Sequence, residues 1–175
     1  MSTLNEPSEP SEPSEPSEPS EPSELYDPAL AAAQEALVLA MTSGGPMPEG
    51  FDAEAVRAAA RGILLKRAGE VGRAWPALAA SYGPSWTEAF ADWAAARPTR
   101  GSHRDGWDFA RAREAGLPAE AARELALAGV RWSYDGEGEP RPRRAAVRRV
   151  PGGLAVLVMG RVREIPTGRS RRAMV

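Results

Sequence analysis

The chain has 175 residues, enough for one domain, with a formal net charge of −2, one histidine and no cysteine. The absence of cysteine excludes disulfides, thiolate catalysis and cysteine-ligated metal sites. No apolar stretch approaches the roughly 20 residues of a membrane-spanning helix and no secretory signal pattern is present, so we expect a cytoplasmic bacterial protein with no membrane partner.

Residues 1–26 are expected to form a disordered tail. Residues 6 to 23 are six copies of Glu-Pro-Ser. Proline at every third position favours extended polyproline II backbone, the glutamates repel one another, and no apolar side chain is available for a core. The chain up to Asp27 carries eight acidic and no basic residues, whereas residues 28 to 175 carry sixteen acidic and twenty-two basic residues. The net charge therefore combines an acidic tail with a basic remainder.

Residues 27–129 are expected to form a helical domain. Capping residues, prolines and glycines divide this region into five or six helices. The expected helices run from Asp27 to about Thr42, from Asp52 to Trp75, from Trp75 to Tyr82, from Ser85 to the residues before Pro98, from about His103 to Ala115, and from Pro118 to Ala128, where Gly129 ends the last one.

Two start signals and an aromatic stripe lie in the middle of this region. Ser85 and Glu88 have capping-box spacing, and Ser102 with Asp105 resembles a second, weaker signal of the same kind. Trp86, Phe90, Trp93 and Ala94 recur every three or four residues along a single predicted helix. This spacing favours packing in the core over exposure at an interface.

Residues 130–166 are expected to form a small β-hairpin region packed on the helices. "VRWSYDG" alternates, and "AAVRRVPGGLAVLVMGRV" places two strand-like runs around Pro151-Gly152-Gly153. Residues 167–175 read as a basic, disordered end. The expected fold is mainly α with a small C-terminal antiparallel β element (α+β), that is, five to six helices followed by two to three strands.

The residue types give no support for catalysis. His103 has no second histidine or cysteine, and both the hydrolytic triads and the zinc sites need such companions. Asp105 with Asp108, and Glu120 with Glu124, have the spacing of solvated helix faces. No phosphate loop, nucleophile elbow or dinucleotide fingerprint is present. We therefore expect no enzyme, no catalytic or metal-binding residue and no cofactor.

The loop after the aromatic helix is the candidate contact site for a protein partner, because Trp and Arg dominate interface energetics. The candidate partner-binding residues are Arg97, Pro98, Arg100, Arg104, Asp105 and Trp107. A solvated loop over buried rings is the alternative interpretation.

Two further functional readings compete with a protein partner. Arg141, Arg143, Arg144, Arg148 and Arg149 form a basic segment that could neutralise phosphates of a nucleic acid. No predicted helix combines a basic face with base-reading residues, so we expect at most weak, salt-sensitive binding to nucleic acid. A helical domain with no partner is the third reading.

The run from Leu64 to Ala112 resembles the partner proteins of multinuclear non-haem iron-dependent oxidases. In that family a helix ends in an aromatic-Pro pair, and a short helix, a glycine, a helix with aromatic anchors, a proline-containing loop and a Gly-x-x-Phe helix start follow. The corresponding elements here are Trp75-Pro76, Gly83, Phe90 with Trp93, Pro98, and Gly106 with Phe109. The chain looks closest to a helical domain that actinobacteria sometimes carry fused C-terminal to the oxidase.

This resemblance implies a non-catalytic accessory protein. It would dock on an oxidase that has a TIM-barrel fold and holds the irons, and it would assist modification of a precursor peptide. Such partners usually have a C-terminal mixed domain akin to peptide-recognition modules, whereas the β part of this chain is short. The hairpin could still take up a leader peptide by strand addition.

Overall fold

A computed structural model describes residues 27–167, so the predicted tail (1–26) and all but the first residue of the predicted basic end (167–175) lie outside the described residues. The helical elements are α1 (Pro28–Ser43), α2 (Ala53–Ala74), α3 (Pro76–Tyr82), the 3₁₀ turn η1 (Gly83–Ser85), α4 (Trp86–Ala94), α5 (Ser102–Arg111), the 3₁₀ turn η2 (Glu114–Gly116) and α6 (Ala119–Arg131). The strands are β1 (Trp132–Ser133), β2 (Arg141–Pro142), β3 (Ala145–Val150), β4 (Gly153–Val158) and β5 (Arg161–Pro166).

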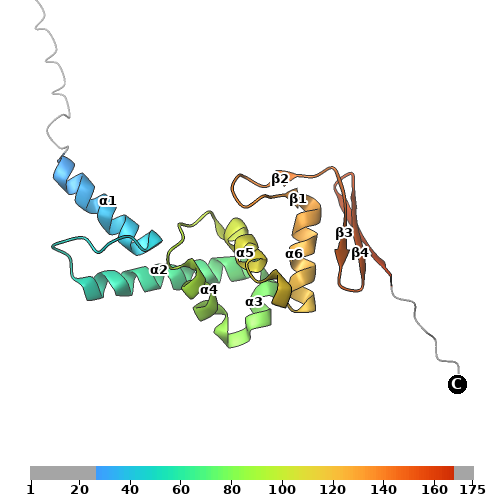
Figure 1. The fold of residues 1–175 in the computed structure, drawn as a ribbon, viewed down its shortest axis with the longest axis horizontal. Coiled ribbons are helices and arrows are strands. Elements are labelled where there is room, and N and C mark those ends of the chain that lie inside the picture. The colour runs from blue at the N-terminus through green and yellow to red at the C-terminus, as the bar shows by residue number, and fades with distance from the viewer. Residues whose placement is uncertain (1–26, 168–175) are drawn as a thin grey trace, which may run out of the picture.

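The described residues form an elongated body with different ends (Figure 1). Helices α1 and α2 lie side by side at one end, the remaining helices fill the middle, and the sheet β3-β4-β5 closes the other end against α6. The predicted fold class, helices followed by a small antiparallel β element, is confirmed. The structure adds a second ladder, in which β1 pairs with β2 over two residues each.

The first two helices begin as the sequence predicts. The Asp27 carboxylate accepts the amides of Ala29 and Leu30, and the Asp52 carboxylate caps α2 in the same way. Gly44 ends α1 in the left-handed conformation, with a φ of 68°. These local signals set the ends of α1 and the start of α2.

The core of the helical region is aromatic and centres on Phe109 of α5. The Phe109 ring is fully buried, and rings from α3 and α4 surround it with centroids 5.4–5.5 Å away. The surrounding rings are Tyr82, Trp86, Phe90 and Trp93. The predicted aromatic stripe therefore packs inward, since Trp86, Phe90 and Ala94 are buried and Trp93 is partly buried against them.

Steric contact with Trp75 explains why residue 106 is a glycine. A Cβ on Gly106 would lie 2.2 Å from Cδ1 of Trp75, so the indole packs directly on the α5 backbone. The indole N–H of Trp75 donates to the carbonyl of His103 at 2.9 Å. One close contact and one hydrogen bond thus fix α5 against the end of α2.

The Ser85 capping box predicted for α4 is wrong. Ser85 closes η1 with helical backbone angles (φ −81°, ψ −4°) and makes no side-chain cap, because a capping residue needs extended angles for its hydroxyl to reach the free amides. Glu88 instead pairs with Arg61 of α2 at 2.7 Å. The helix begins where predicted, but by a different mechanism.

Helix α6 runs past its predicted end at Gly129, to Arg131. The sheet packs on it at this point: the Arg148 guanidinium donates to the Gly129 carbonyl at 3.0 Å, and a Cβ at 129 would lie 3.1 Å from Nε of Arg148. Val130, one residue further, is fully buried in a second small cluster with Val150 and Leu157 of the sheet. Gly129 therefore allows a close helix–sheet approach rather than ending the helix.

Candidate docking surface

A buried ion pair between α2 and α5 fixes the predicted contact loop between α4 and α5. Arg67 of α2 and Asp105 of α5 meet at 2.8 Å (Nε to Oδ2), and their side chains are 9% and 3% exposed. The same guanidinium donates to the carbonyls of Arg97 at 2.7 Å and Pro98 at 3.3 Å. One arginine from α2 therefore fixes the loop backbone to the helical core.

The Asp105 carboxylate serves the same loop and not the start of α5. It accepts the Thr99 hydroxyl at 2.8 Å and the Arg100 amide at 2.9 Å. Ser102 is the first residue of α5, Gly101 precedes it with a φ of 91°, and no side chain caps the helix. The capping signal predicted from Ser102 and Asp105 is therefore wrong, because the Asp105 carboxylate binds Arg67 instead.

The outer side of the loop presents Arg97, Pro98 and Arg100 to solvent, with Arg104 half-buried. The Arg100 guanidinium donates to the Gly136 carbonyl, and Arg104 pairs with Glu139 at 2.7 Å. The loop is therefore also connected to the β1–β2 segment. These four residues remain candidate partner contacts.

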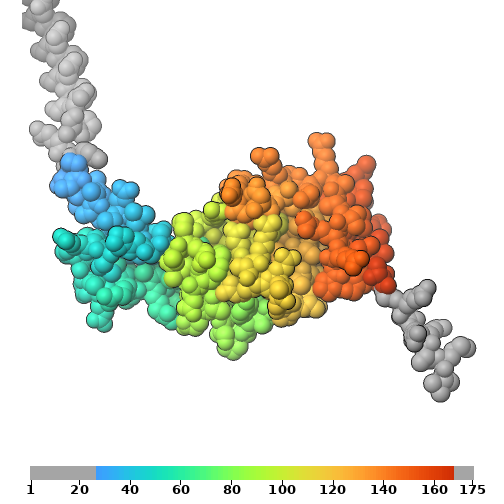
Figure 2. Space-filling model, viewed as in Figure 1, coloured from blue at the N-terminus to red at the C-terminus, as the bar shows by residue number. Residues whose placement is uncertain are grey.

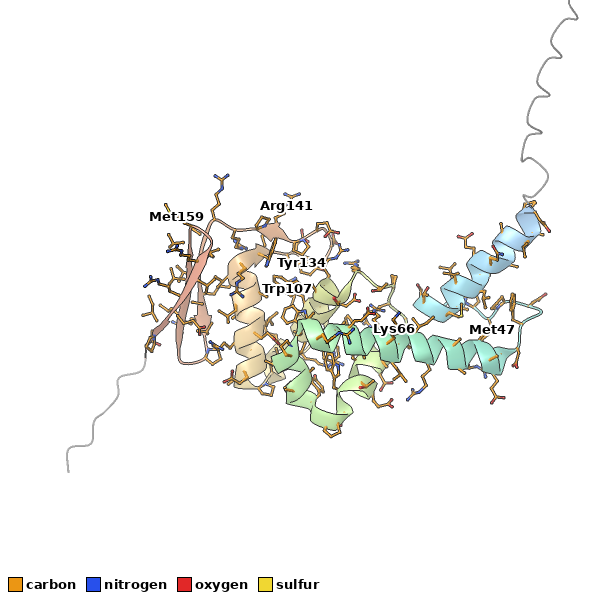
Figure 3. The ribbon with its side chains drawn as sticks, turned by 180° about the vertical axis from the view of Figure 1, so that it is seen from behind. Met47, Lys66, Trp107, Tyr134, Arg141 and Met159 are labelled. Carbon is orange, nitrogen blue, oxygen red and sulfur yellow. The ribbon has the colours of Figure 1, made fainter. Side chains whose placement is uncertain are left out.

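Asp105 and Trp107, also predicted as partner contacts, need correction, because both are buried. The Trp107 ring packs edge-on against Trp75 at 5.9 Å and Tyr134 at 5.2 Å. Figure 3 labels Trp107 and Tyr134 close together in the middle of the molecule. The Tyr134 hydroxyl donates to Asp108 at 2.9 Å, and burial raises the pKa of this phenol. Asp105 and Trp107 therefore support the loop from the core and are not accessible to a partner.

Of the four carboxylates expected on solvated faces, Glu120 is exposed as predicted, whereas the other three have structural partners. Besides Asp105 and Asp108, Glu124 accepts the amides of Ala77 and Leu78 at 3.2 and 2.8 Å and so caps α3. The His103 ring is exposed and packs on the indole of Trp75. Across residues 27–167 no group of three or more His, Asp or Glu side chains is arranged to hold a metal ion.

The predicted basic segment does not form one face. Arg148 points toward α6, while Arg149 lies on the opposite face of the same strand. Arg143 donates to the Trp132 carbonyl and the Ser133 hydroxyl. Arginines that are close in sequence therefore point in different directions, which breaks the phosphate-binding stripe that the sequence suggested.

An exposed apolar surface on the α1–α2 hairpin was not predicted from the sequence. We call this hairpin the arm. Helix α1 has no buried residue. Leu30 is 57% exposed and Val38 52% exposed. The exposed apolar residues of the arm are Leu30, Val38, Leu39, Met47, Phe51, Ile63 and Leu65. Figure 2 shows the arm at one end of the molecule, extending away from the helical core.

A sequence signal for this surface was present. Of the sixteen residues of α1, "PALAAAQEALVLAMTS", only Glu35 is charged, and apolar side chains occur all around the helix. A helix that is apolar on every side is normally buried. Here α2 covers one side only, because the other helices lie further along the molecule.

The arm and the contact loop lie next to each other. A Cβ on Gly44, at the end of α1, would be 3.0 Å from the carbonyl oxygen of Ala95 and 3.3 Å from Cα of Ala96. These residues lead directly into Arg97 and Pro98. The exposed arm and the pinned loop therefore form one candidate docking surface. None of the helices in residues 27–167 is both long enough and apolar enough to cross a membrane.

Most of this surface lies in a segment that is similar to known proteins. Residues 31–115 match the family described as SCO6045-like, C-terminal domain. A UPF0276 protein of Streptomyces avermitilis is 42% identical over 106 residues, which is 57% of this chain and 22% of that protein. The chain therefore spans about a fifth of the length of this relative. No solved structure matches the chain.

Proposed function

We propose that this chain is a non-catalytic accessory protein that docks on a larger protein through its arm and the adjoining loop. The class of partner is the one the sequence resemblance implies, a multinuclear non-haem iron-dependent oxidase that modifies a precursor peptide. The observation that carries the proposal is the arm: seven exposed large apolar side chains on a two-helix hairpin, with an α1 that buries no residue.

The comparisons support a docking role through the position of the matched segment. The segment begins at residue 31 and so includes nearly all of α1. In the Streptomyces relative the matching residues are a minor part of a much longer chain. An apolar hairpin of this kind favours burial against other protein surface, which is the role proposed for the arm.

The loop adds specificity to this apolar contact. Its backbone is fixed by Arg67 and Asp105 before any partner binds, so little conformational entropy is lost on docking. Arg97 and Pro98 are exposed beside the end of the arm. A rigid basic rim next to an aliphatic patch is the usual anatomy of a protein–protein interface.

Assistance with the precursor peptide is the part of the proposed role that the resemblance implies. The sheet has the order β3-β4-β5, so β5 is an edge strand with main-chain groups available for an added strand. No structural observation favours nucleic-acid binding, because the arginines after Pro140 are divided between faces.

Co-purification with the candidate oxidase from the same genome tests the proposal, followed by titration calorimetry. We expect a one-to-one complex in the micromolar range or tighter, about −8 kcal/mol or more. Replacing Val38 and Leu39 by Gln should weaken it at least about ten-fold, because two exposed apolar side chains of the arm would no longer be buried on the partner. Glutamine is a good helix former, so α1 should persist.

The matched control replaces two exposed apolar residues at the other end of the molecule, Val147 and Val158, by Gln. This variant should bind the oxidase as the natural chain does. No complex at concentrations of about 100 µM, or equal weakening by both double variants, would contradict docking through the arm.

A further inference from the structure

A second exposed apolar surface lies at the opposite end of the molecule, outside the matched segment. Side chains alternate along a strand, so the side of the sheet away from α6 carries every second residue of β3, β4 and β5. We call this the outer sheet face. Its cross-strand rows are Ala145–Val158–Arg161, Val147–Val156–Arg163 and Arg149–Leu154–Ile165. Val147, Val158 and Ile165 are 63%, 55% and 52% exposed.

The pattern on the outer sheet face is ordered. Its six apolar side chains form a diagonal band that runs from the start of β3 across β4 to the end of β5. Arg149 occupies the corner on one side of the band, and Arg161 with Arg163 the corner on the other. No acidic side chain lies on this face, because Glu164 points to the inner side and binds Arg123 of α6 at 2.6–2.8 Å. The band therefore has positive charge on both sides.

The turn between β4 and β5 extends the apolar surface at a conformational cost. Met159 is 91% exposed and has a φ of +49°, a conformation that favours Gly or Asn. Figure 3 shows Met159 at the opposite end of the molecule from Met47 of the arm. Nothing in the fold requires a methionine there. Natural proteins break such local rules mainly at functional or strained sites.

We propose that the outer sheet face binds an acidic amphipathic helix of a partner protein. Helix α6 already covers the inner face of the sheet, and a helix on the outer face would complete a three-layer arrangement. The apolar stripe of such a helix would lie on the diagonal band. Acidic residues on its two flanks would meet Arg149 on one side and Arg161 and Arg163 on the other.

Other occupants fit this pattern less well. A strand added at β5 would leave the band on β4 uncovered. The Glu-Pro-Ser repeats of residues 6 to 23 have the charge but contain no large apolar side chain. A second copy would bring two sets of arginines together. A nucleic acid would find phosphate contacts, but no aromatic side chain on this face to stack on a base.

The test titrates the full-length chain into a fluorescein-labelled 16-residue peptide with leucines at helical spacing and glutamates on both flanks. We expect saturable binding with a dissociation constant on the order of 10–100 µM in low salt, weakening as salt is raised. Arg161→Glu with Arg163→Glu should weaken binding at least ten-fold. The matched charge change Arg57→Glu with Arg73→Glu, on the exposed side of α2, should leave it unchanged.

Met159→Asn is a second variant that keeps the fold, because asparagine suits the turn, and it should weaken binding several-fold. Three results would overturn the proposal. The first is no saturation by about 1 mM peptide. The second is equal affinity for a peptide of six Glu-Pro-Ser repeats or for a scrambled peptide of the same composition, and the third is tighter binding of a 16-base-pair DNA duplex that displaces the helical peptide. Loss of binding to the oxidase with retained peptide binding would leave this proposal standing, since the two surfaces are separate.

Discussion

The helical core and the arm differ in how completely their side chains are buried and hydrogen-bonded. In the core, the indoles of Trp75 and Trp86 donate to backbone carbonyls, and the buried charge of Arg67 is matched by Asp105. No buried side-chain nitrogen or oxygen in residues 27–167 lacks a hydrogen-bond partner. The arm, by contrast, leaves large apolar side chains in solvent. Stability is therefore carried by one set of residues and, in our proposal, docking by another.

The largest expected effect is at the buried ion pair. Arg67→Met should lower the free energy of unfolding by about 3–5 kcal/mol, because it leaves the Asp105 carboxylate buried and unpaired. The control is Arg61→Met, whose pair with Glu88 is more than half exposed on both sides and should contribute about 0–1 kcal/mol. Urea unfolding measures both. Equal effects of the two variants would contradict the assigned role of Arg67.

The contact of Trp75 with Gly106 should give the next largest effect. Gly106→Ala forces a methyl group into the indole, so we expect a loss of about 1–3 kcal/mol or more. Gly62→Ala, on the exposed side of α2 with open space around it, should instead stabilise by roughly 0.5–1 kcal/mol. Thermal unfolding distinguishes them, and a neutral Gly106→Ala would mean that α5 does not pack as described.

A smaller, pH-dependent effect is expected where the sheet joins α6. Hydrogen bonds from Arg123 lower the pKa of Glu164, so the ionised carboxylate stabilises the fold above its ordinary pKa and this contribution is lost as pH falls below it. Glu164→Gln should lower the melting temperature slightly at pH 7, and the difference from the natural chain should shrink as pH falls through the lowered pKa of Glu164. Glu35→Gln on α1 is the control. A difference that grows toward low pH would contradict the assigned ion pair.

The smallest effect on stability is expected in the arm. Val38→Gln with Leu39→Gln should change the free energy of unfolding by about 0.5 kcal/mol or less per site, since exposed positions away from special features rarely matter more. The same variant should lose affinity for the proposed oxidase partner. A large loss of stability would show that α1 is part of the core, and the contrast between the two regions would fail.

The helix boundaries were largely predictable because they depend on local signals. Asp27, Asp52 and the Trp75-Pro76 pair act on neighbouring backbone, and the structure follows them. The failures occurred where a distant partner competed for the same group. Asp105 binds Arg67 instead of capping α5, and Gly129 admits Arg148 instead of ending α6.

The candidate site was predicted in part. The loop with Arg97, Pro98, Arg100 and Arg104 is at the surface, but Asp105 and Trp107 are buried beneath it. Sequence spacing shows that an indole lies near a helix start, not which way it points. The arm was missed because its apolar residues read as core, and only the tertiary arrangement shows that α2 covers just one side of α1.

Hydrogen–deuterium exchange of the chain alone and bound to the oxidase is the most direct test of the central claim, that the arm is the surface a partner covers. We predict that the amides of α1 and of the residues on either side of Pro98 exchange more slowly in the complex. The amides of β3, β4 and β5 should exchange at unchanged rates. Unchanged exchange in α1, with protection confined to the sheet or absent altogether, would contradict the account.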